Sequence, residues 1–297
     1  MFKQHYRFIK GYSLVLAATA IWSGNFIVAR ILSNSVPPVT IFIFRSLIAI
    51  TILAPFVAGH LRQEFPAIRK HLGYLALTAF LGLTICNTVV YIAAATTKAL
   101  NLTLIAISSP VFTIIFARIF LHDTLTLRRV IGLVAATAGV VLLITSGQIS
   151  HLANLTFSEG DLWMLGQASS FALYTILVRM KPGELSPLTF LFSLFIIGML
   201  FLLPLFLWKL PETEAVHFTP AILGAILYLG VGPSLLAYLC WNESVAIIGP
   251  ARASFVYYCL PLFSGVEGLL LLGEQVTAIH VFSGVMILAG VIFATSE

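Results

Sequence analysis

Charged residues are scarce in this chain: they make up 9% of its 297 residues, against roughly 25% in a typical soluble domain. Hydrophobic residues make up 60%, and the mean hydropathy is +1.04. Such a composition excludes an ordinary soluble globule and predicts an integral membrane protein. The apolar stretches are continuous rather than alternating, which predicts membrane-spanning helices instead of a β-barrel.

The sequence also lacks the patterns of disulfides, metal centres and nucleotide-binding motifs. The three cysteines, Cys86, Cys240 and Cys259, have no paired spacing, and the seven histidines fall at the ends of apolar runs and in the connections. Neither a disulfide framework nor a metal centre is indicated. A glycine-rich phosphate-binding motif is also missing, so we expect no ATP-driven step and no cofactor. The basic residues do not gather on one soluble face, which argues against a nucleic-acid partner.

Ten apolar runs are present, separated by polar, glycine, proline or charged breaks. They predict ten transmembrane helices at residues 12–32, 39–58, 72–94, 102–121, 130–146, 161–178, 188–208, 221–241, 251–272 and 276–295. The longest connections, at 60–71, 147–160 and 209–220, are predicted to be loops, and they are too short to hold a soluble domain.

The first run follows Lys3, Arg7 and Lys10 and contains Ala-Ala-Thr-Ala, so a cleaved signal peptide is an alternative to a retained helix. Its hydrophobicity continues through residue 32, longer than a signal peptide needs, which favours a retained helix. Most lysine and arginine residues fall in segments that face the cytoplasm if the N-terminus does. We therefore expect a multi-pass protein of the cytoplasmic (inner) membrane with both termini in the cytoplasm.

The second half of the chain repeats the first. Residues 108–126 and 259–277 align without a gap, so that Pro110 meets Pro261 and Thr126 meets Thr277. This predicts an N-terminal five-helix repeat at 1–147, an external linker at 148–158 and a C-terminal five-helix repeat at 159–297. Five is an odd number, so the second repeat enters the membrane from the opposite side. The predicted fold is an all-α integral membrane protein of two inverted five-helix repeats, an architecture suited to alternating access around a site at the membrane midplane.

Motifs along almost the whole chain resemble the drug/metabolite transporter superfamily, and within it the ten-helix EamA-type permeases. They are Ala-Thr-Ala-Ile-Trp-Ser-Gly-Asn-Phe at 18–26, an arginine in the second span, and the paired motifs at 108–126 and 259–277. The resemblance implies peripheral or dimer-supporting fifth and tenth helices, and a cavity enclosed by the others. The first span lacks the glutamate that small multidrug transporters of this superfamily carry there, which argues against cationic-drug exchange.

Four residues are candidates for gating or coupling: Arg45, Pro110, Pro261 and Glu267. The prolines fall midway along their spans, where each should kink its helix and form either a packing bend or a hinge. Arg45 and Glu267 lie at similar depths from the outer ends of their spans. Intramembrane charges are costly and usually face the interior, so the two either pair at an external gate or satisfy separate partners.

Amide, aromatic and basic side chains in the spans are candidates for substrate binding. The candidates are Trp22, Asn25, Asn87, Tyr91, Asn101, Tyr174, Tyr238, Trp241, Asn242, Arg252, Tyr257 and Tyr258. The alternatives are the aromatic belt at the membrane interface, which could account for Trp241, and snorkelling to the interface for Arg252.

These patterns predict a secondary or facilitative transporter of small metabolites, with export of amino acids as the favoured case. The expected partners are a zwitterionic or anionic small molecule, membrane lipids and, if transport is coupled, a proton; the protein is expected to be a monomer or homodimer. Proton-coupled efflux of drugs or organic cations and translocation of a lipid-linked group are the alternatives. A membrane enzyme would need carboxylates, histidines or metal ligands clustered at one depth, and the sequence shows none.

Overall fold

The computed structural model describes residues 2–32, 36–89, 105–148, 159–209, 219–272 and 277–296. All regular secondary structure in these residues is helical. The N-terminal half contains α1 (Phe2–Leu32), α2 (Pro38–Lys70), α3 (Leu72–Ala79), the π-helical turn η1 (Phe80–Ile85), α6 (Ser109–Phe120) and α7 (Leu127–Ile144). The C-terminal half contains α9 (Glu159–Arg179), α10 (Pro187–Lys209), α11 (Pro220–Leu229), the π-helical turn η3 (Gly230–Leu236), α12 (Ala237–Ile248), α13 (Pro250–Tyr257), α14 (Leu260–Leu272) and α15 (Ala278–Thr295).

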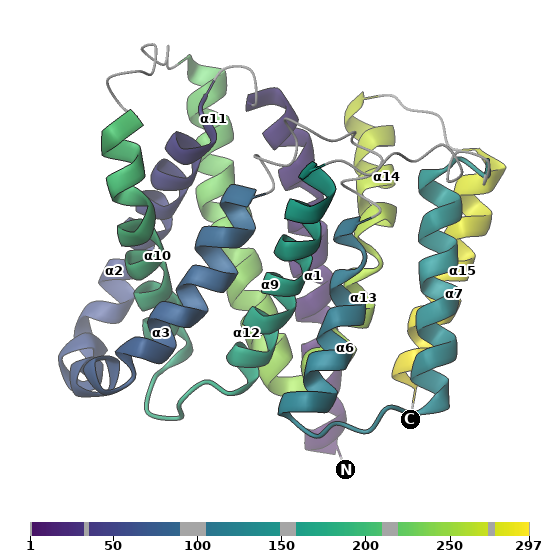
Figure 1. Ribbon diagram of the computed structural model, residues 1–297, viewed down its shortest axis with the longest axis horizontal. Coiled ribbons are helices and arrows are strands. Elements are labelled where there is room, and N and C mark those ends of the chain that lie inside the picture. The colour runs from purple at the N-terminus through teal and green to yellow at the C-terminus, as the bar shows by residue number, and fades with distance from the viewer. Residues whose placement is uncertain are drawn as a thin grey trace.

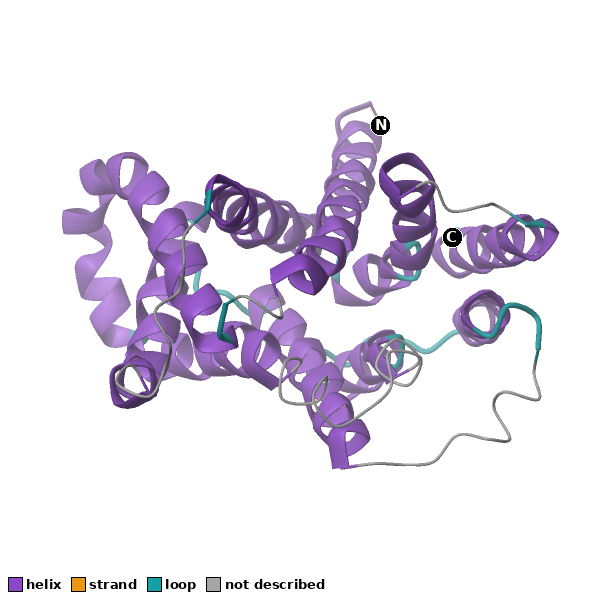
Figure 2. Cartoon of the chain, turned by 90° about the horizontal axis from the view of Figure 1, so that it is seen from above, coloured by secondary structure: helices purple, strands orange, loops and turns teal. Residues whose placement is uncertain are grey.

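Within the described residues, helices lie in each of the ten predicted spans, and the chain is an all-α integral membrane protein. In the described part of the chain, six helices are long and apolar enough to cross a membrane: Val39–Lys70, Leu72–Val89, Leu127–Ile144, Pro187–Trp208, Pro220–Ile248 and Ala278–Thr295. The helices run side by side, and Figure 2 shows several of them nearly end-on. Large apolar side chains such as Leu270 and Val134 remain exposed, as expected for surfaces that face lipid.

The repeat seen in the sequence is also present in the structure. A shift of 151 residues moves α7 onto α15, α6 onto all but the last residue of α14, and η1 into η3. Both chain termini lie on the same side of the molecule (Figure 1), as an even number of spans requires. The chain therefore consists of two five-helix repeats of opposite orientation in the membrane.

Pro110 and Pro261 each follow a break in a helix. Pro110 is the second residue of α6 and Pro261 the second residue of α14. Just before them the backbone forms tight turns, in which the Ser108 amide donates to the Ile105 carbonyl at 2.9 Å and the Cys259 amide to the Val256 carbonyl at 2.9 Å. Proline has no N–H to donate, so it fits the first turn of each new helix. The predicted kink is thus a full interruption, at matching positions in both halves.

One predicted loop is helical. Residues 60–71 were expected to form a connection, but α2 continues to Lys70 and only His71 separates it from α3. This extension is rich in residues with good helix propensity, and Pro66 is accommodated inside it. The polar residues indicate where the chain leaves the apolar layer. The helix continues past that point because the residues there favour helical structure.

Helices α7 and α15 form a close pair at one edge of the molecule (Figure 1). A Cβ atom added to Gly132 would lie 2.5 Å from the Gly290 carbonyl oxygen, and one added to Gly139 would lie 3.0 Å from the Ile287 backbone nitrogen. These glycines let the backbones of α7 and α15 approach each other closely. Gly284 of α15 is different, because an added Cβ would meet only the Leu262 side chain, at an ordinary 3.4 Å.

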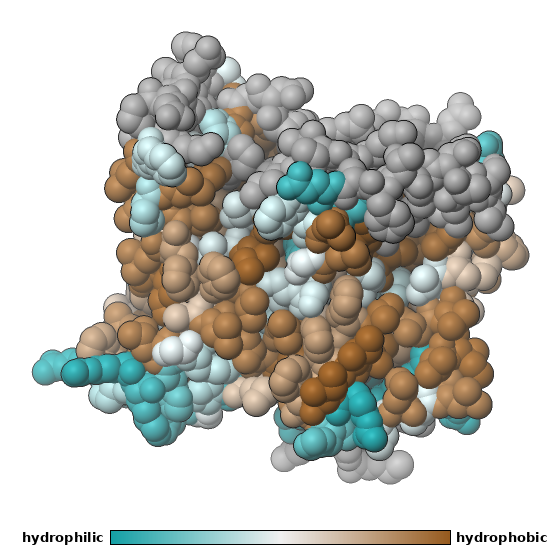
Figure 3. All heavy atoms as spheres, viewed as in Figure 1, coloured by the Kyte–Doolittle hydropathy of each residue, from teal (hydrophilic) through white to brown (hydrophobic). Residues whose placement is uncertain are grey.

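Polar contacts join the two halves on the side of the molecule that carries the termini. Lys10 of α1 pairs with Glu243 of α12 at 3.1 Å, and Glu184 accepts from Lys70 at 2.7 Å and lies 2.9 Å from His71. Hydrogen bonds from Lys70 and then His71 hold the pKa of the Glu184 carboxyl below its ordinary value. Figure 3 shows hydrophilic residues along this side and a hydrophobic band beside them.

The close α7–α15 contact predicts a difference between two glycine substitutions on α15. A Cβ at position 290 would lie 2.6 Å from the Ala136 backbone nitrogen, so Gly290→Ala must push the helices apart. We expect it to lower the free energy of unfolding by about 1–3 kcal/mol. Gly284→Ala is the matched control and should be neutral or stabilising, since alanine favours helices. Thermal unfolding in detergent micelles, followed by tryptophan fluorescence, measures both; equal stability of the two variants would contradict the close contact.

Candidate functional site

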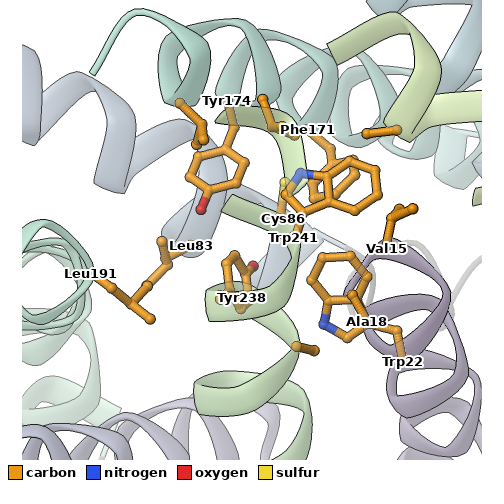
Figure 4. Close-up of a cluster of buried hydrophobic side chains, with 14 of the residues drawn as sticks. Val15, Ala18, Trp22, Leu83, Cys86, Phe171, Tyr174, Leu191, Tyr238 and Trp241 are labelled. Atoms are coloured by element: carbon orange, nitrogen blue, oxygen red, sulfur yellow. The ribbon is translucent and has the colours of Figure 1, made fainter. Parts of the chain in front are cut away.

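Six aromatic side chains from four helices meet in the interior of the protein. We call this group the aromatic cluster; it consists of Trp22 of α1, Phe171 and Tyr174 of α9, Tyr238 and Trp241 of α12, and Tyr257 of α13. Trp22 contacts four of the others, with ring centroids 5.3 Å from Trp241, 5.4 Å from Tyr238, 5.7 Å from Phe171 and 6.1 Å from Tyr257. Figure 4 shows the rings of Trp22, Tyr238, Trp241 and Phe171 gathered together.

Two buried hydrogen-bonding groups at this cluster lack a partner. The Tyr174 hydroxyl donates to Asn242 Oδ1 at 2.7 Å, which fixes one end of the Asn242 amide. In the described part of the structure, the Nδ2 group of Asn242 and the indole Nε1 of Trp241 are buried without an acceptor. Trp241 is 0% exposed and Asn242 8%. Buried donors are normally satisfied, so two that are not can serve an acceptor on a ligand.

Side chains of each half donate to the backbone of the π-helical turn in the other half. Tyr238 donates to the Gly82 carbonyl of η1 at 2.8 Å, and Trp22 Nε1 donates to the Pro233 carbonyl of η3 at 3.1 Å. Gly82 and Pro233 are 151 residues apart, so they are equivalent positions of the repeat. Ser170 of α9 also donates to the Leu81 carbonyl of η1, at 2.9 Å. The two turns therefore form a symmetric seam between the halves.

Equivalent residues of the two repeats also contact each other directly. Asn87 Nδ2 lies 3.5 Å from the Tyr238 hydroxyl, and these positions differ by 151. Nearer the start of each half, residues 37–42 (PPVTIF) align with residues 186–191 (SPLTFL) at an offset of 149. Trp22 and Phe171, whose rings touch, are equivalent under this offset. A residue can meet its own symmetry equivalent only near the symmetry axis. The aromatic cluster thus lies close to the pseudo-two-fold axis that relates the repeats.

The predicted gating residues Arg45 and Glu267 each contact α1. Arg45 is 4% exposed; its Nε donates to the Ser234 hydroxyl at 2.6 Å, and its Nη1 lies 3.5 Å from Asn25 Oδ1. Glu267 Oε1 lies 2.7 Å from the Ser23 hydroxyl. Of the two alternatives left by the sequence, the geometry matches separate partners.

Several predicted site residues lie elsewhere. The Tyr258 hydroxyl lies 2.9 Å from Thr137 of α7, so it faces the peripheral helix pair. The guanidinium carbon of Arg252 lies 5.6 Å from the ring centroid of Phe8. Tyr91 and Asn101 are outside the described residues.

Some residues of this region were not identified from the sequence. Phe171 lies in the cluster, and its alignment with Trp22 at the offset of 149 is a signal that could have identified it. Ser23 and Ser234, which bind the two intramembrane charges, are common in membrane helices and carry no distinguishing pattern. Only their contacts in the folded chain reveal them.

Two inverted repeats with an aromatic and polar centre on their axis define a class of protein, the multi-pass membrane transporters. The chain belongs to the EamA-like transporter family, whose model matches residues 9–145 and again residues 158–296. A member of this family takes a small-molecule substrate and sits in lipid.

Known proteins are similar to this chain over most of its length. It is 27% identical to the uncharacterized transporter YyaM of Bacillus subtilis (strain 168) over 77% of this chain and 74% of that protein. An uncharacterized transporter of Archaeoglobus fulgidus is 26% identical, with 96% of this chain and 97% of that protein covered. A solved crystal structure matches 96% of both chains with a TM-score of 0.75 at 16% identity, which shows a shared fold.

The seam between the halves predicts the effect of removing one hydroxyl. Tyr238→Phe keeps the ring but leaves the Gly82 carbonyl without its side-chain donor inside the membrane. We expect a loss of about 1–3 kcal/mol in the free energy of unfolding, the cost of an unsatisfied buried group. Tyr6→Phe, at a position 71% exposed in α1, is the control and should be neutral. Thermal unfolding in detergent compares them, and an unchanged melting temperature for Tyr238→Phe would show that this bond contributes nothing.

Proposed function

We propose that this protein is a secondary or facilitative transporter of small zwitterionic or anionic metabolites, with amino acids as the first candidates and export as its direction. The observation that carries the proposal is the pair of unsatisfied donors, Trp241 Nε1 and Asn242 Nδ2, at an aromatic cluster on the axis between the repeats. A carboxylate or carbonyl oxygen accepts from such donors, and a binding site in this position can be exposed to either side by movement of the two halves.

The aromatic cluster can contact the side chain and the ammonium group of an amino acid. The rings of Trp22, Phe171 and Tyr257 offer apolar faces for a side chain. The same faces attract an ammonium group, because a desolvated cation is stabilised over an aromatic ring. An α-carboxylate and an α-ammonium group on one small molecule therefore complement the donors and the rings together.

Alternating access gives the inverted repeats their role. The Lys10–Glu243 and Lys70–Glu184 ion pairs join the two halves on one side of the molecule. Both pairs are exposed, so each contributes little to stability and can be broken as the halves rock. We assign this side to the cytoplasm of a cell bounded by its inner membrane, since the basic residues of short loops are retained there.

The aromatic cluster also favours a second candidate, efflux of organic cations. Aromatic rings gathered in one place supply faces of the kind that bind quaternary ammonium groups. This candidate predicts transport of tetraalkylammonium ions and no need for the Asn242 amide. The two candidates therefore differ in the substrate and in the response to one substitution.

Counterflow in liposomes tests the proposed function. Purified protein is reconstituted into liposomes preloaded with unlabelled amino acids, and uptake of a labelled panel is measured for the wild type and Asn242→Leu. We expect uptake by the wild type and a loss of about tenfold or more in Asn242→Leu, since hydrogen bonds to charged groups contribute about 1.5–3 kcal/mol.

The control for this experiment is Tyr258→Phe, which removes a hydroxyl directed at Thr137 outside the aromatic cluster and should transport like the wild type. Uptake of tetraethylammonium in place of amino acids would support the second candidate. Uptake of neither, with correctly folded protein, would reject both and leave a lipid-linked substrate as the next class to assay.

A further inference from the structure

Glu267 is an acidic residue inside a membrane span, on α14, and it faces α1. Its two carboxyl oxygens have different surroundings. Oε1 lies 2.7 Å from the Ser23 hydroxyl, and Ser23 is fully buried. Oε2 is buried and, within the described residues, has no hydrogen-bond partner.

The Ser23 hydroxyl cannot donate to both of its neighbours. Its oxygen lies 2.6 Å from the Ala20 carbonyl and 2.7 Å from Glu267 Oε1. A serine hydroxyl has one hydrogen to donate and two lone pairs to accept with. If that hydrogen goes to Ala20, the short contact with Glu267 requires a hydrogen from the carboxyl group. Both contacts are therefore satisfied when Glu267 is a neutral carboxylic acid.

Within the described part of the chain, the charged and titratable groups nearby do not donate a hydrogen bond to the Glu267 carboxyl group in place of its own proton. Arg45 contacts α1 through Asn25, two positions after Ser23 and thus roughly 200° around the helix from it. The guanidinium and the carboxyl therefore approach α1 from different sides. From α11, the Tyr228 hydroxyl donates to the Ile21 carbonyl at 3.2 Å, and it lies with Glu267 Oε2 beside Gly24. Arg45 and Tyr228 are the charged and titratable groups that we identify around Glu267 among the described residues.

We propose that Glu267 and Ser23 form a proton-binding site inside the membrane. When the site is loaded, Glu267 donates to Ser23 and Ser23 donates to the Ala20 carbonyl. When the proton leaves to water, the Ser23 hydrogen turns to Glu267 Oε1 and the carboxylate is charged. A charged carboxylate at this depth is costly, so the empty site favours an arrangement of the halves in which water reaches it.

The position of Ser23 connects this site to the proposed substrate site. Ser23 directly follows Trp22, the ring at the centre of the aromatic cluster, and Trp22 donates to the Pro233 carbonyl of the opposite half. A shift of α1 on proton release therefore moves both contacts together. This coupling rests on the proposed transport function, whereas the proton site itself does not.

Infrared difference spectroscopy of the full-length reconstituted protein tests the proton site without a substrate. We expect a protonated-carboxyl C=O band that titrates with pH, is absent in Glu267→Gln, and shifts in Ser23→Ala, which keeps the carboxyl but removes its partner. Glu159→Gln, at an exposed position in the first turn of α9, is the control and should leave the band unchanged. A band that persists in Glu267→Gln, or one that Ser23→Ala does not move, would overturn the proposal.

Counterflow with an imposed pH gradient then tests the coupling. We expect the gradient to accelerate transport by the wild type and by Glu159→Gln, and to have no effect on Glu267→Gln, which should still exchange substrate. A gradient effect that survives in Glu267→Gln would overturn the coupling. If no substrate exchanges at all while the carboxyl band behaves as expected, the proposed function fails and the proton site stands.

Discussion

The need to satisfy backbone carbonyls inside a membrane is the constraint on which this structure depends. Hydrocarbon offers no hydrogen bonds, so any departure from the regular helix must find partners within the protein. Here the departures are the π-helical turns η1 and η3, whose carbonyls accept from Tyr238 and Trp22 of the opposite half. The hydrogen bonds that satisfy the irregular backbone of each half are therefore the same bonds that join the two halves.

These hydrogen bonds between the halves fix the position of the aromatic cluster. The two donors, Tyr238 and Trp22, are themselves members of the cluster, and their rings lie 5.4 Å apart. Because the turns are equivalent positions of the repeat, the donors converge on the axis that relates the halves. Asn87 and Tyr238, which are also equivalent, meet at the same place. A centre on this axis contacts both halves, which is the geometry that alternating access requires.

The polar groups of the membrane interior divide into two regions along α1. Trp22 belongs to the aromatic cluster, while Ser23 and Asn25, one and three residues later, contact Glu267 and Arg45. One helix of the N-terminal half thus contacts both the proposed substrate site and the two intramembrane charges. Other candidates in the spans lie outside both regions. Pro261 lies at a helix break, and Tyr258 contacts the peripheral helix pair of α7 and α15.

The sequence by itself determined the membrane class, the ten spans and the inverted repeat, and its candidates for substrate binding included five of the six residues that form the aromatic cluster. It could do so because hydrophobic length, charge scarcity and a constant offset are properties of the chain that need no knowledge of packing. These five candidates are tryptophans and tyrosines, whose large rings carry a polar N–H or O–H group and are few inside the spans: Trp22, Tyr174, Tyr238, Trp241 and Tyr257.

Only the tertiary structure decided which of these candidates meet. Tyr258 is adjacent to Tyr257 in sequence, yet a helix places successive side chains about 100° apart, so one faces the cluster and the other Thr137. In the same way, the similar depths of Arg45 and Glu267 suggested a pair, while the rotation of α1 between Ser23 and Asn25 gives each its own partner. Depth along a span can be counted from the sequence, whereas direction around the helix axis is set by the packing of all the helices together.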